Sequence, residues 1–186
     1  MKNILTIDNA LSKKDFSACV KEIEDNNNSK PFKAWWFSFS RWHPKPDTVI
    51  SNIIEKMLWS KKVTEPASKF GDLSWKWFVC RFALGFEVQV TSYKLKNHYK
   101  WHVDHADGDG RILNYILYMT EVDGGELEVC DITTLKIGTK AGDKYHKTIS
   151  IKPKKNRLVI IPTWIIHRVN PVKTGNRITI NGHIKI

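Results

Sequence analysis

The sequence predicts a mainly β chain of the α+β class, in which N-terminal helices support a jelly-roll barrel. From residue 75 onward, short strand-like runs follow one another and are separated by Gly, Asp, Asn and Pro. Before residue 75, apolar residues recur at helical spacing. A length of 186 residues suits one well-filled core. We therefore expect a single domain over residues 1–186, with helical support and a loop in 1–74 and the barrel in 75–186.

Two helices are expected in the N-terminal third. The first begins near Ser12, which lies three residues before Asp15 in the spacing of a capping box, and the Asn run at 26–28 ends it. The second spans about 47–60, where apolar residues form a stripe on one face. These helices supply the support on which the barrel rests.

Other runs in the sequence are expected to be strands or a loop. PFKAWWFSFSRW (31–42) alternates aromatic and polar residues, which predicts a half-buried strand with its aromatic side chains in the core. The polar stretch 60–74 is expected to be a mobile loop near the barrel mouth. The strands expected in the barrel are WKWFVCRF (75–82), FEVQVTSY (86–93), YKWHVD (99–104), RILNYILYM (111–119), GELEVCD (125–131), HKTISI (146–151), RLVIIP (157–162), IIHRV (165–169) and RITINGHIKI (177–186).

The net charge of +11 raises the possibility of a nucleic-acid partner, because Lys and Arg neutralise phosphates. The basic residues are scattered, however, and the densest group, at 144–157, falls on an expected strand and turn. Lysines at such a position are typical of a solvated sheet edge that must not pair with another chain. We therefore favour a basic surface over a nucleic-acid face.

The cysteines and the hydropathy indicate the compartment. Cys19, Cys80 and Cys130 are odd in number and widely spaced, which favours reduced core thiols over a disulfide framework or a zinc site. The N-terminal residues lack the apolar block of a signal peptide, and no apolar run is long enough to span a membrane. We expect a cytoplasmic, intracellular protein without a membrane partner. Its oligomeric state stays open.

His102 and Asp104 are the first candidate metal ligands. Side chains two apart on a strand share a face, so these two should point the same way, whereas His105 points elsewhere or enters the following turn. An imidazole and a carboxylate are two parts of a 2-His-1-carboxylate facial triad, which suits non-heme Fe(II) and needs one more histidine from a distant strand.

His167 is the strongest candidate for that histidine. It lies in the apolar segment TWIIHRVNP, whereas His43, His98 and His146 lie in polar surroundings typical of surface residues. A core histidine that bonds to backbone would explain His167 equally well. Arg177 begins the last strand, where a guanidinium needs a carboxylate partner, either from a ligand or from a protein salt bridge.

These motifs, in this order, resemble the pattern of the Fe(II)- and 2-oxoglutarate-dependent dioxygenases, and more closely that of their prolyl 4-hydroxylase-like branch. WHVDHADGDGRILNYILYMTE (101–121) is similar to that branch's HxD strand, its loop and its following strand. DGGEL (123–127) is similar to its GGEL turn, and residues 157–180 resemble its second half. The resemblance covers about 75–186 well and the N-terminal third loosely. It implies a double-stranded β-helix, the jelly-roll fold also called cupin-like.

The resemblance also implies a role for each site residue. His102, Asp104 and His167 would bind Fe(II), with no catalytic side chain beyond this metal centre. Arg177 would bind the C5 carboxylate of 2-oxoglutarate. The other expected site residues are Thr179, Tyr118 and Tyr93, which would assist the cosubstrate, and Tyr99, Asn114, Ile116 and His183, which would line the substrate pocket. His183 takes the place of a Trp found in many relatives and shares a strand face with Arg177, so it would alter substrate fit or compete as a ligand.

The implied activity is the hydroxylation of an unactivated C–H bond, with 2-oxoglutarate converted to succinate and CO₂ and with ascorbate as the reductant. A prolyl residue in a peptide or protein is the favoured substrate. An alkylated nucleic acid, a free amino acid or another protein residue remains an alternative. A non-enzymatic jelly roll with a structural or vestigial metal is a further alternative, which the presence of three ligands together with Arg177 disfavours.

Overall fold

The computed structural model of the chain describes residues 3–26, 30–34, 37–80, 85–104, 108–130 and 147–186. Within these ranges the helices are α1 (Lys13–Asp25), α2 (Val49–Leu58), α3 (Lys61–Ala67) and α4 (Leu73–Val79). The strands are β1 (Leu5–Ile7), β2 (Lys30–Ala34), β3 (Phe37–Trp42), β4 (Gly85–Phe86), β5 (Gln89–Tyr93), β6 (Tyr99–His102), β7 (Arg111–Tyr118), β8 (Leu127–Cys130), β9 (Thr148–Ile151), β10 (Leu158–Pro162), β11 (His167–Val169) and β12 (Arg177–Lys185). None of the helices described is long and apolar enough to cross a membrane.

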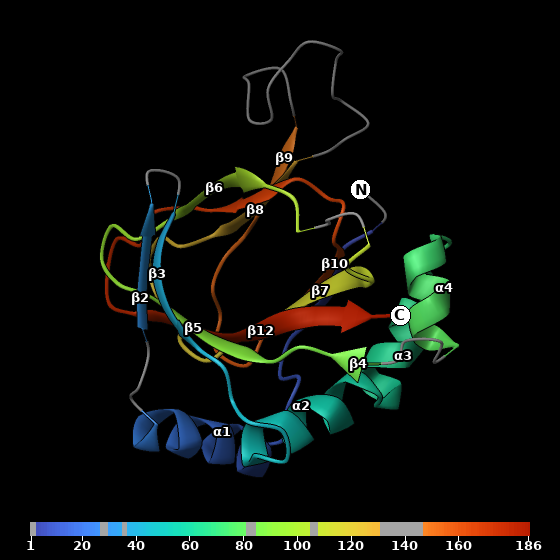
Figure 1. Cartoon of the computed structure of the whole chain (residues 1–186). Helices are drawn as coiled ribbons and strands as arrows, with labels where there is room; N and C mark the ends of the chain where they lie inside the picture. Colours follow the sequence, from blue (N-terminus) through green and yellow to red (C-terminus); the bar gives the residue numbers. More distant parts are fainter. Residues whose placement is uncertain (1–2, 27–29, 35–36, 81–84, 105–107, 131–146) are drawn as a thin grey trace.

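The strands form one antiparallel sheet in the order β1-β10-β7-β12-β5-β3-β6-β11-β8-β9, with β2 added to β3 and β4 to β12. The sheet curls over, so that β6 and β8 lie above β5 and β12, while α1 and α2 lie below them (Figure 1). The molecule therefore has two layers of strands with helices on one outer face, and residues of both layers line one space.

Strand β12 separates the core from this space by simple alternation. Ile180 and Ile184 are fully buried and belong to the hydrophobic core that the sheet shares with the helices. Arg177, Thr179 and His183 lie on the opposite face and line a cavity between the layers. Period-two alternation thus places apolar side chains toward the helices and polar side chains toward the cavity.

The first two helices lie where the sequence predicts them. Ser12 caps α1, since its Oγ accepts a hydrogen bond from the backbone N–H of Asp15 at 3.1 Å and donates one to the Asp15 carboxylate at 2.8 Å. Asn26 caps the C-terminal end of α1 through a backbone hydrogen bond to Glu22. The Glu22 carboxylate also accepts a hydrogen bond from the N–H of Ile50 at 2.7 Å, which joins α1 to the start of α2.

The expected strand at 75–82 is wrong, because residues 75–79 belong to α4. Asp72 caps this helix by accepting a hydrogen bond from the N–H of Ser74 at 2.9 Å. Trp75 and Phe78, three positions apart, are fully buried on one helical face. A short apolar run can form either a helix or a strand, and packing under the sheet selects the helix here.

The expected loop at 60–74 is also wrong, since it contains α3 and the start of α4. Val63 and Ala67, four positions apart, are buried at 1% and 0% exposure, which anchors α3 to the core. The segment 31–42 gives two strands of a hairpin, β2 and β3, in place of one strand. With β1, these strands bring part of the expected helical region into the sheet.

The remaining strands from residue 85 onward lie where the sequence predicts them. Strand β9 ends the sheet and exposes residues 148–150, in agreement with a solvated edge, although residues 144–146 lie outside the described ranges. Cys19 and Cys130 are buried, as expected for core thiols, and form no disulfide bond among the described residues, whereas Cys80 is exposed because it lies at the C-cap of α4.

Candidate active site

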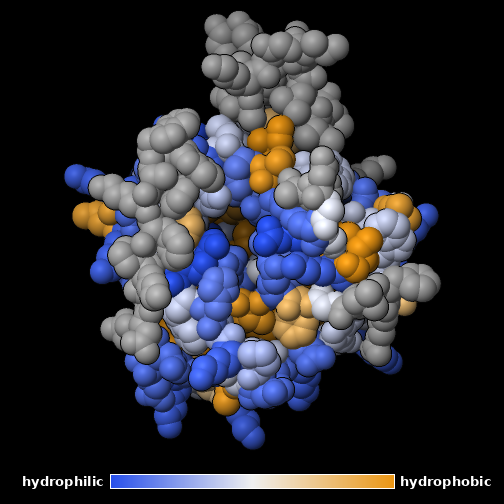
Figure 2. Space-filling model, in the orientation of Figure 1, coloured by the Kyte–Doolittle hydropathy of each residue, from blue (hydrophilic) through white to orange (hydrophobic). Residues whose placement is uncertain are grey.

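A cavity of about 520 Å³ opens between the two strand layers. The face seen in Figure 2 is hollowed near its centre, with hydrophilic side chains gathered around the hollow. The cavity is lined by residues from β3, β5, β6, β7, β8, β11 and β12 and from the segments beside them. Distant parts of the sequence therefore contribute to one site.

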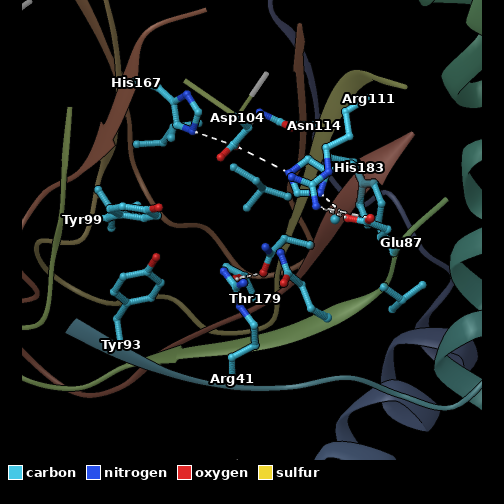
Figure 3. A pocket seen from close by; sticks show the side chains of 18 of the residues that line it. Arg41, Glu87, Tyr93, Tyr99, Asp104, Arg111, Asn114, His167, Thr179 and His183 are labelled. Carbon is cyan, nitrogen blue, oxygen red and sulfur yellow. Dashed lines mark hydrogen bonds and ion pairs between the residues drawn. The ribbon is translucent and has the colours of Figure 1, made fainter. Parts of the chain in front are cut away.

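Three potential metal ligands converge at one side of this cavity, where Figure 3 shows two of them, Asp104 and His167. His102 ends β6, Asp104 follows two residues later, and His167 begins β11. The backbone register pairs His102 directly with His167, so the two imidazoles come from adjacent strands. One ligand atom from each of the three residues lies within 4.8 Å of the other two, which is close enough for a single metal ion.

Backbone contacts orient both imidazoles. The Nδ1 atom of His102 lies 2.7 Å from the carbonyl oxygen of Lys100, and that of His167 lies 2.9 Å from the carbonyl oxygen of Ile165. Each Nδ1–H therefore donates to a carbonyl and leaves the Nε2 lone pair free. The two Nε2 atoms face Asp104, at 3.5 Å from Oδ1 for His102 and 3.3 Å from Oδ2 for His167. This tautomer is the one that a metal requires.

The protonation states favour metal binding as well. Burial, together with the neighbouring His167, lowers the pKa of His102 to about 4, so its imidazole is neutral at physiological pH. Burial alone would raise the pKa of Asp104, but the neighbouring imidazoles of His167 and His183 hold it well below its usual range. Asn114 donates a hydrogen bond to Asp104 Oδ2 at 2.8 Å, which positions the carboxylate. The site therefore presents a neutral nitrogen donor at His102 and an anionic oxygen donor at Asp104.

Arg177 lies on the cavity wall with 1% exposure and forms no ion pair with any carboxylate in the described ranges. Its guanidinium lies between the rings of Tyr93 and Tyr118, 4.9 and 5.0 Å from their centroids. The Arg177 Nε and the Tyr118 hydroxyl are both buried, and neither has a hydrogen-bond partner in the part of the chain that the structure describes. A buried guanidinium needs a counter-anion. The side chains therefore fit a carboxylate ligand such as that of 2-oxoglutarate.

Gly125 leaves room for the Arg177 side chain. Its φ of +66° lies in the left-handed region, and a Cβ atom there would meet Arg177 Cδ at 2.8 Å. The GGEL turn thus supports the arginine from behind. Thr179 is also buried in the cavity wall, where its hydroxyl donates to Asn181 Oδ1 at 3.1 Å.

Tyr93 and Tyr99 line another side of the cavity (Figure 3). The Tyr99 ring stacks on the His102 imidazole at a centroid distance of 3.7 Å, which fixes the imidazole plane. Burial raises the pKa of Tyr99 to about 12, so its hydroxyl stays protonated and can donate a hydrogen bond. Burial raises the pKa of Tyr93 as well.

His183 faces the cavity, as expected, but a carboxylate engages it. Its Nδ1 lies 2.6 Å from Glu87 Oε2, while its Nε2 lies 3.8 Å from Asp104 Oδ2. Burial alone would raise the pKa of Glu87, but hydrogen bonds from Lys185 and His183 lower it to about 2. His183 therefore connects Glu87 to the metal ligands and lies just outside the group of three.

Three expected site residues and four other histidines remain to be placed. Asn114 and Ile116 line the cavity, whereas Tyr118 lies behind Arg177 and is absent from the lining. His43 was expected at the surface, and it is exposed while also lining the cavity mouth. His98 is half-buried outside the cavity. His105 and His146 lie outside the described ranges.

Sequence reasoning missed five charged or amide side chains of the cavity. They are Arg41, Glu87, Gln89, Arg111 and Asn181. A signal existed for two of them, because Asn181 shares a strand face with Arg177, and Glu87 lies two residues before the inward-facing Gln89. Arg41 lies two residues after Phe39 and therefore shares the strand face that was expected to be core, so only the structure reveals that it lines the cavity.

Solved structures with this fold include several oxygenases. A prolyl-4-hydroxylase from Pseudomonas putida matches with a TM-score of 0.71 and 17% identity, covering 100% of this chain and 93% of its own. A Trichoplax adhaerens prolyl hydroxylase, in complex with a hypoxia inducible factor peptide fragment, matches at 0.70 and 14%, covering 100% and 84%. The collagen prolyl hydroxylase of Paramecium bursaria Chlorella virus-1, in a 2-oxoglutarate complex, matches at 0.60 and 22%, covering 99% and 96%. No curated protein sequence matches the chain.

These neighbours confirm the mainly β, double-stranded β-helix fold expected from the sequence. The family model described as the 2OG-Fe(II) oxygenase superfamily matches residues 88–185, which is more than half of the chain and includes the three potential metal ligands and Arg177. Fe(II) and 2-oxoglutarate are the metal and cosubstrate that this family implies, and the donor set fits both. The chain belongs to the 2OG-Fe(II) oxygenase superfamily.

Proposed function

We propose that the protein is an Fe(II)- and 2-oxoglutarate-dependent dioxygenase that hydroxylates a prolyl residue of a peptide or protein. One observation carries the oxygenase part. The imidazole Nε2 atoms of His102 and His167 converge on Asp104 in the same cavity that holds the unpaired guanidinium of Arg177. A metal ion and a dicarboxylate that binds to it must lie next to each other, so the residues that hold them must line the same cavity.

Each residue has a defined task in this proposal. His102, Asp104 and His167 hold Fe(II), and Asn114 orients the carboxylate by its hydrogen bond to Oδ2. Arg177 binds the C5 carboxylate of 2-oxoglutarate by a charge-assisted pair.

Supporting side chains complete the pocket. Tyr118 assists from behind the cavity wall, where its ring packs against the Arg177 guanidinium, and Thr179 and Tyr93 line the cavity beside Arg177. Tyr99 and Ile116 bound the substrate space and exclude water from it.

Fe(II) with 2-oxoglutarate supplies the oxidative chemistry, in which one oxygen atom of dioxygen enters succinate as CO₂ is lost and the other becomes the substrate hydroxyl. The protein contributes orientation. Rigid strands β6, β11 and β12 carry the ligands and Arg177, so their spacing is set before substrate arrives. Ascorbate is the proposed reductant that returns oxidised iron to Fe(II).

A prolyl substrate rests on resemblance. The HxD strand, the GGEL turn and the order of the motifs are similar to the prolyl 4-hydroxylase-like branch. The Trichoplax adhaerens neighbour is a prolyl hydroxylase bound to a peptide fragment. Because one fold supports many substrates, the peptide assignment needs a direct assay.

The assay measures succinate released from 2-oxoglutarate by purified protein with Fe(II), ascorbate and prolyl peptides. The wild type should release succinate in proportion to hydroxyproline, whereas His167→Ala should release only background. His98→Ala is the matched control, since this histidine lies outside the cavity, and it should behave as the wild type. Equal succinate release by wild type and His167→Ala would contradict the oxygenase proposal, and succinate release without hydroxyproline would contradict the prolyl one.

A further inference from the structure

The cavity contains a second guanidinium that the proposed function does not use. Arg41, on β3, enters from the side opposite His167 and Asp104 (Figure 3). The sheet register explains its position. Arg41 pairs with Thr91 on β5, and Thr91 pairs with Thr179 on β12, so these three side chains lie in one row across the cavity wall.

No carboxylate of the described residues compensates Arg41. Within the described ranges it forms no ion pair, its buried Nε has no hydrogen-bond partner, and its guanidinium lies 4.8 Å from the centroid of the Phe39 ring. Burial lowers the pKa of its guanidinium, although an arginine stays charged in a protein. Holding an unpaired cation here is costly unless an anion arrives.

The other charges at this end of the cavity are already matched. Glu87 is engaged by Lys185 at 2.5 Å and by Arg111 at 3.2 Å, and Arg111 also faces Asp109 at 3.5 Å. These four residues form two acids and two bases, so the group needs no further counter-ion. Both of its carboxylates, those of Glu87 and Asp109, are already paired with bases and are not available to Arg41.

The proposed metal and cosubstrate leave Arg41 uncompensated as well. Asp104 would neutralise part of the charge of Fe(II), and 2-oxoglutarate would bring two carboxylates, one on the metal and one on Arg177. Arg41 is then the cation of the cavity lining without a counter-charge among the described residues. The net charge of +11 adds a long-range field that favours anionic ligands.

We propose that Arg41 binds a carboxylate of the substrate and thereby selects acids over the corresponding amides. This inference rests on the proposed function for the reaction and adds the substrate class: a molecule whose free carboxylate lies close to the C–H bond to be hydroxylated. The carboxylate has two possible sources, a free acid of proline size or the C-terminal carboxylate of a peptide. Either would place its anion on Arg41 and its ring toward the metal centre across a cavity of about 520 Å³.

The first experiment tests the anion site with trifluoroacetate as the probe, followed by fluorine NMR. The protein carries Fe(II) and saturating 2-oxoglutarate under anaerobic conditions, so Arg177 is occupied and the iron broadens the signal of nearby probe. Saturable broadening is expected in the wild type, with affinity about tenfold weaker in Arg41→Gln, because one charge-assisted pair is lost. Neutral trifluoroacetamide should show none.

Arg168→Gln is the matched control. Arg168 is a cation of β11 that pairs with Glu128 outside the cavity, so its removal should leave the titration unchanged. Equal binding of trifluoroacetate by wild type and Arg41→Gln, or equal broadening of the amide, would overturn the proposal. The same titration of metal-free protein, read by chemical shift, measures the anion site even if iron does not bind.

The second experiment distinguishes the two sources by succinate release. N-acetyl-L-proline is compared with N-acetyl-L-prolinamide, and an Ala-Ala-Pro peptide with a free C-terminus is compared with its amide. The acid of one pair should be preferred about tenfold by the wild type and not by Arg41→Gln. Equal turnover of acid and amide in both enzymes overturns the proposal while leaving the oxygenase function intact. Absence of succinate with every compound leaves the decision on Arg41 to the fluorine titration.

Discussion

Gly125 is the residue at which one added methyl group should weaken 2-oxoglutarate binding more than it weakens the fold. A Cβ atom at Gly125 would lie 2.8 Å from Arg177 Cδ and 3.2 Å from Val172 Cγ2. Ordinary contacts begin near 3.4 Å, so the arginine side chain must move by about 0.6 Å. A displaced guanidinium loses alignment with a carboxylate, which costs about 1.5 kcal/mol when one charge-assisted hydrogen bond is lost.

Gly125→Ala should therefore raise the dissociation constant for 2-oxoglutarate about tenfold. The substitution also forces alanine to adopt a φ of +66°, and that left-handed backbone costs about 1 kcal/mol of folding stability. Gly175→Ala is the matched control, because Gly175 has a φ of +67° but its added Cβ would meet only Val122 Cγ1, at 3.4 Å. Both variants should lose about 2–4 °C in Tm, and only Gly125→Ala should lose cosubstrate affinity.

The assay is isothermal titration of the anaerobic Fe(II)-loaded protein with 2-oxoglutarate, together with thermal unfolding of each variant. Equal 2-oxoglutarate affinities for Gly125→Ala and Gly175→Ala would refute the reasoning, since the contact with Arg177 would then have no effect on binding. Loss of affinity in both variants would show that backbone strain alone controls the pocket.

Substitutions at three further residues test the stability of the fold. Glu87→Gln should lower the free energy of unfolding above pH 4.5, where the wild-type carboxylate is ionised in both the folded and the unfolded protein. The wild type loses this advantage as the pH falls toward the Glu87 pKa of about 2, so the urea midpoints of the two proteins should converge between these pH values. A difference in midpoint that stays constant with pH would contradict the ion-pair account. Asn156 has a φ of 61° and bonds both the N–H and the carbonyl of Leu11 at 2.9 Å, so Asn156→Ala should cost about 3 kcal/mol and Asn156→Gly about 2 kcal/mol in chemical unfolding; equal losses would argue against backbone strain. Ile54→Ala should cost about 2–5 kcal/mol through a cavity under the sheet while leaving 2-oxoglutarate affinity unchanged, as calorimetry would verify.

The strands were predictable where alternation and turn residues agree. Strand β12 shows this best, since Ile180 and Ile184 pack against the helices while Arg177 and Thr179 face the cavity. The same alternation indicated that His102 and Asp104 belong together, and the structure places their side chains 3.5 Å apart. Local periodicity reports which face a side chain occupies, and that information is present in a single sequence.

Elements whose structure depends on distant packing were not predictable in the same way. Trp75 and Phe78 are strand-favouring residues, yet they form a helix because both can be buried under the sheet at helical spacing. Val63 and Ala67 likewise order a segment that is polar overall. In each segment tertiary burial outweighs the local composition.

The positions of the charged side chains in the cavity depend on the register and order of the strands, which local sequence patterns do not give. The contact between Glu87 and His183 joins residues 96 positions apart, and no local pattern encodes it. Arg41 enters the cavity because β3 lies between β5 and β6 in the sheet, an order that the sequence does not specify. Such contacts decide substrate charge and pocket shape, and they follow from the way the sheet is assembled.

The central claim is that one cavity binds both iron and 2-oxoglutarate through the three metal ligands and Arg177. Anaerobic titration with Fe(II) and 2-oxoglutarate, followed by the metal-to-ligand charge-transfer band, tests it most directly. We predict a band that saturates at one metal per chain, is absent in His167→Ala, and needs more 2-oxoglutarate in Arg177→Ala, whose iron binding stays intact. A wild-type protein that binds iron without forming the band, or a band unchanged in both variants, would contradict the claim.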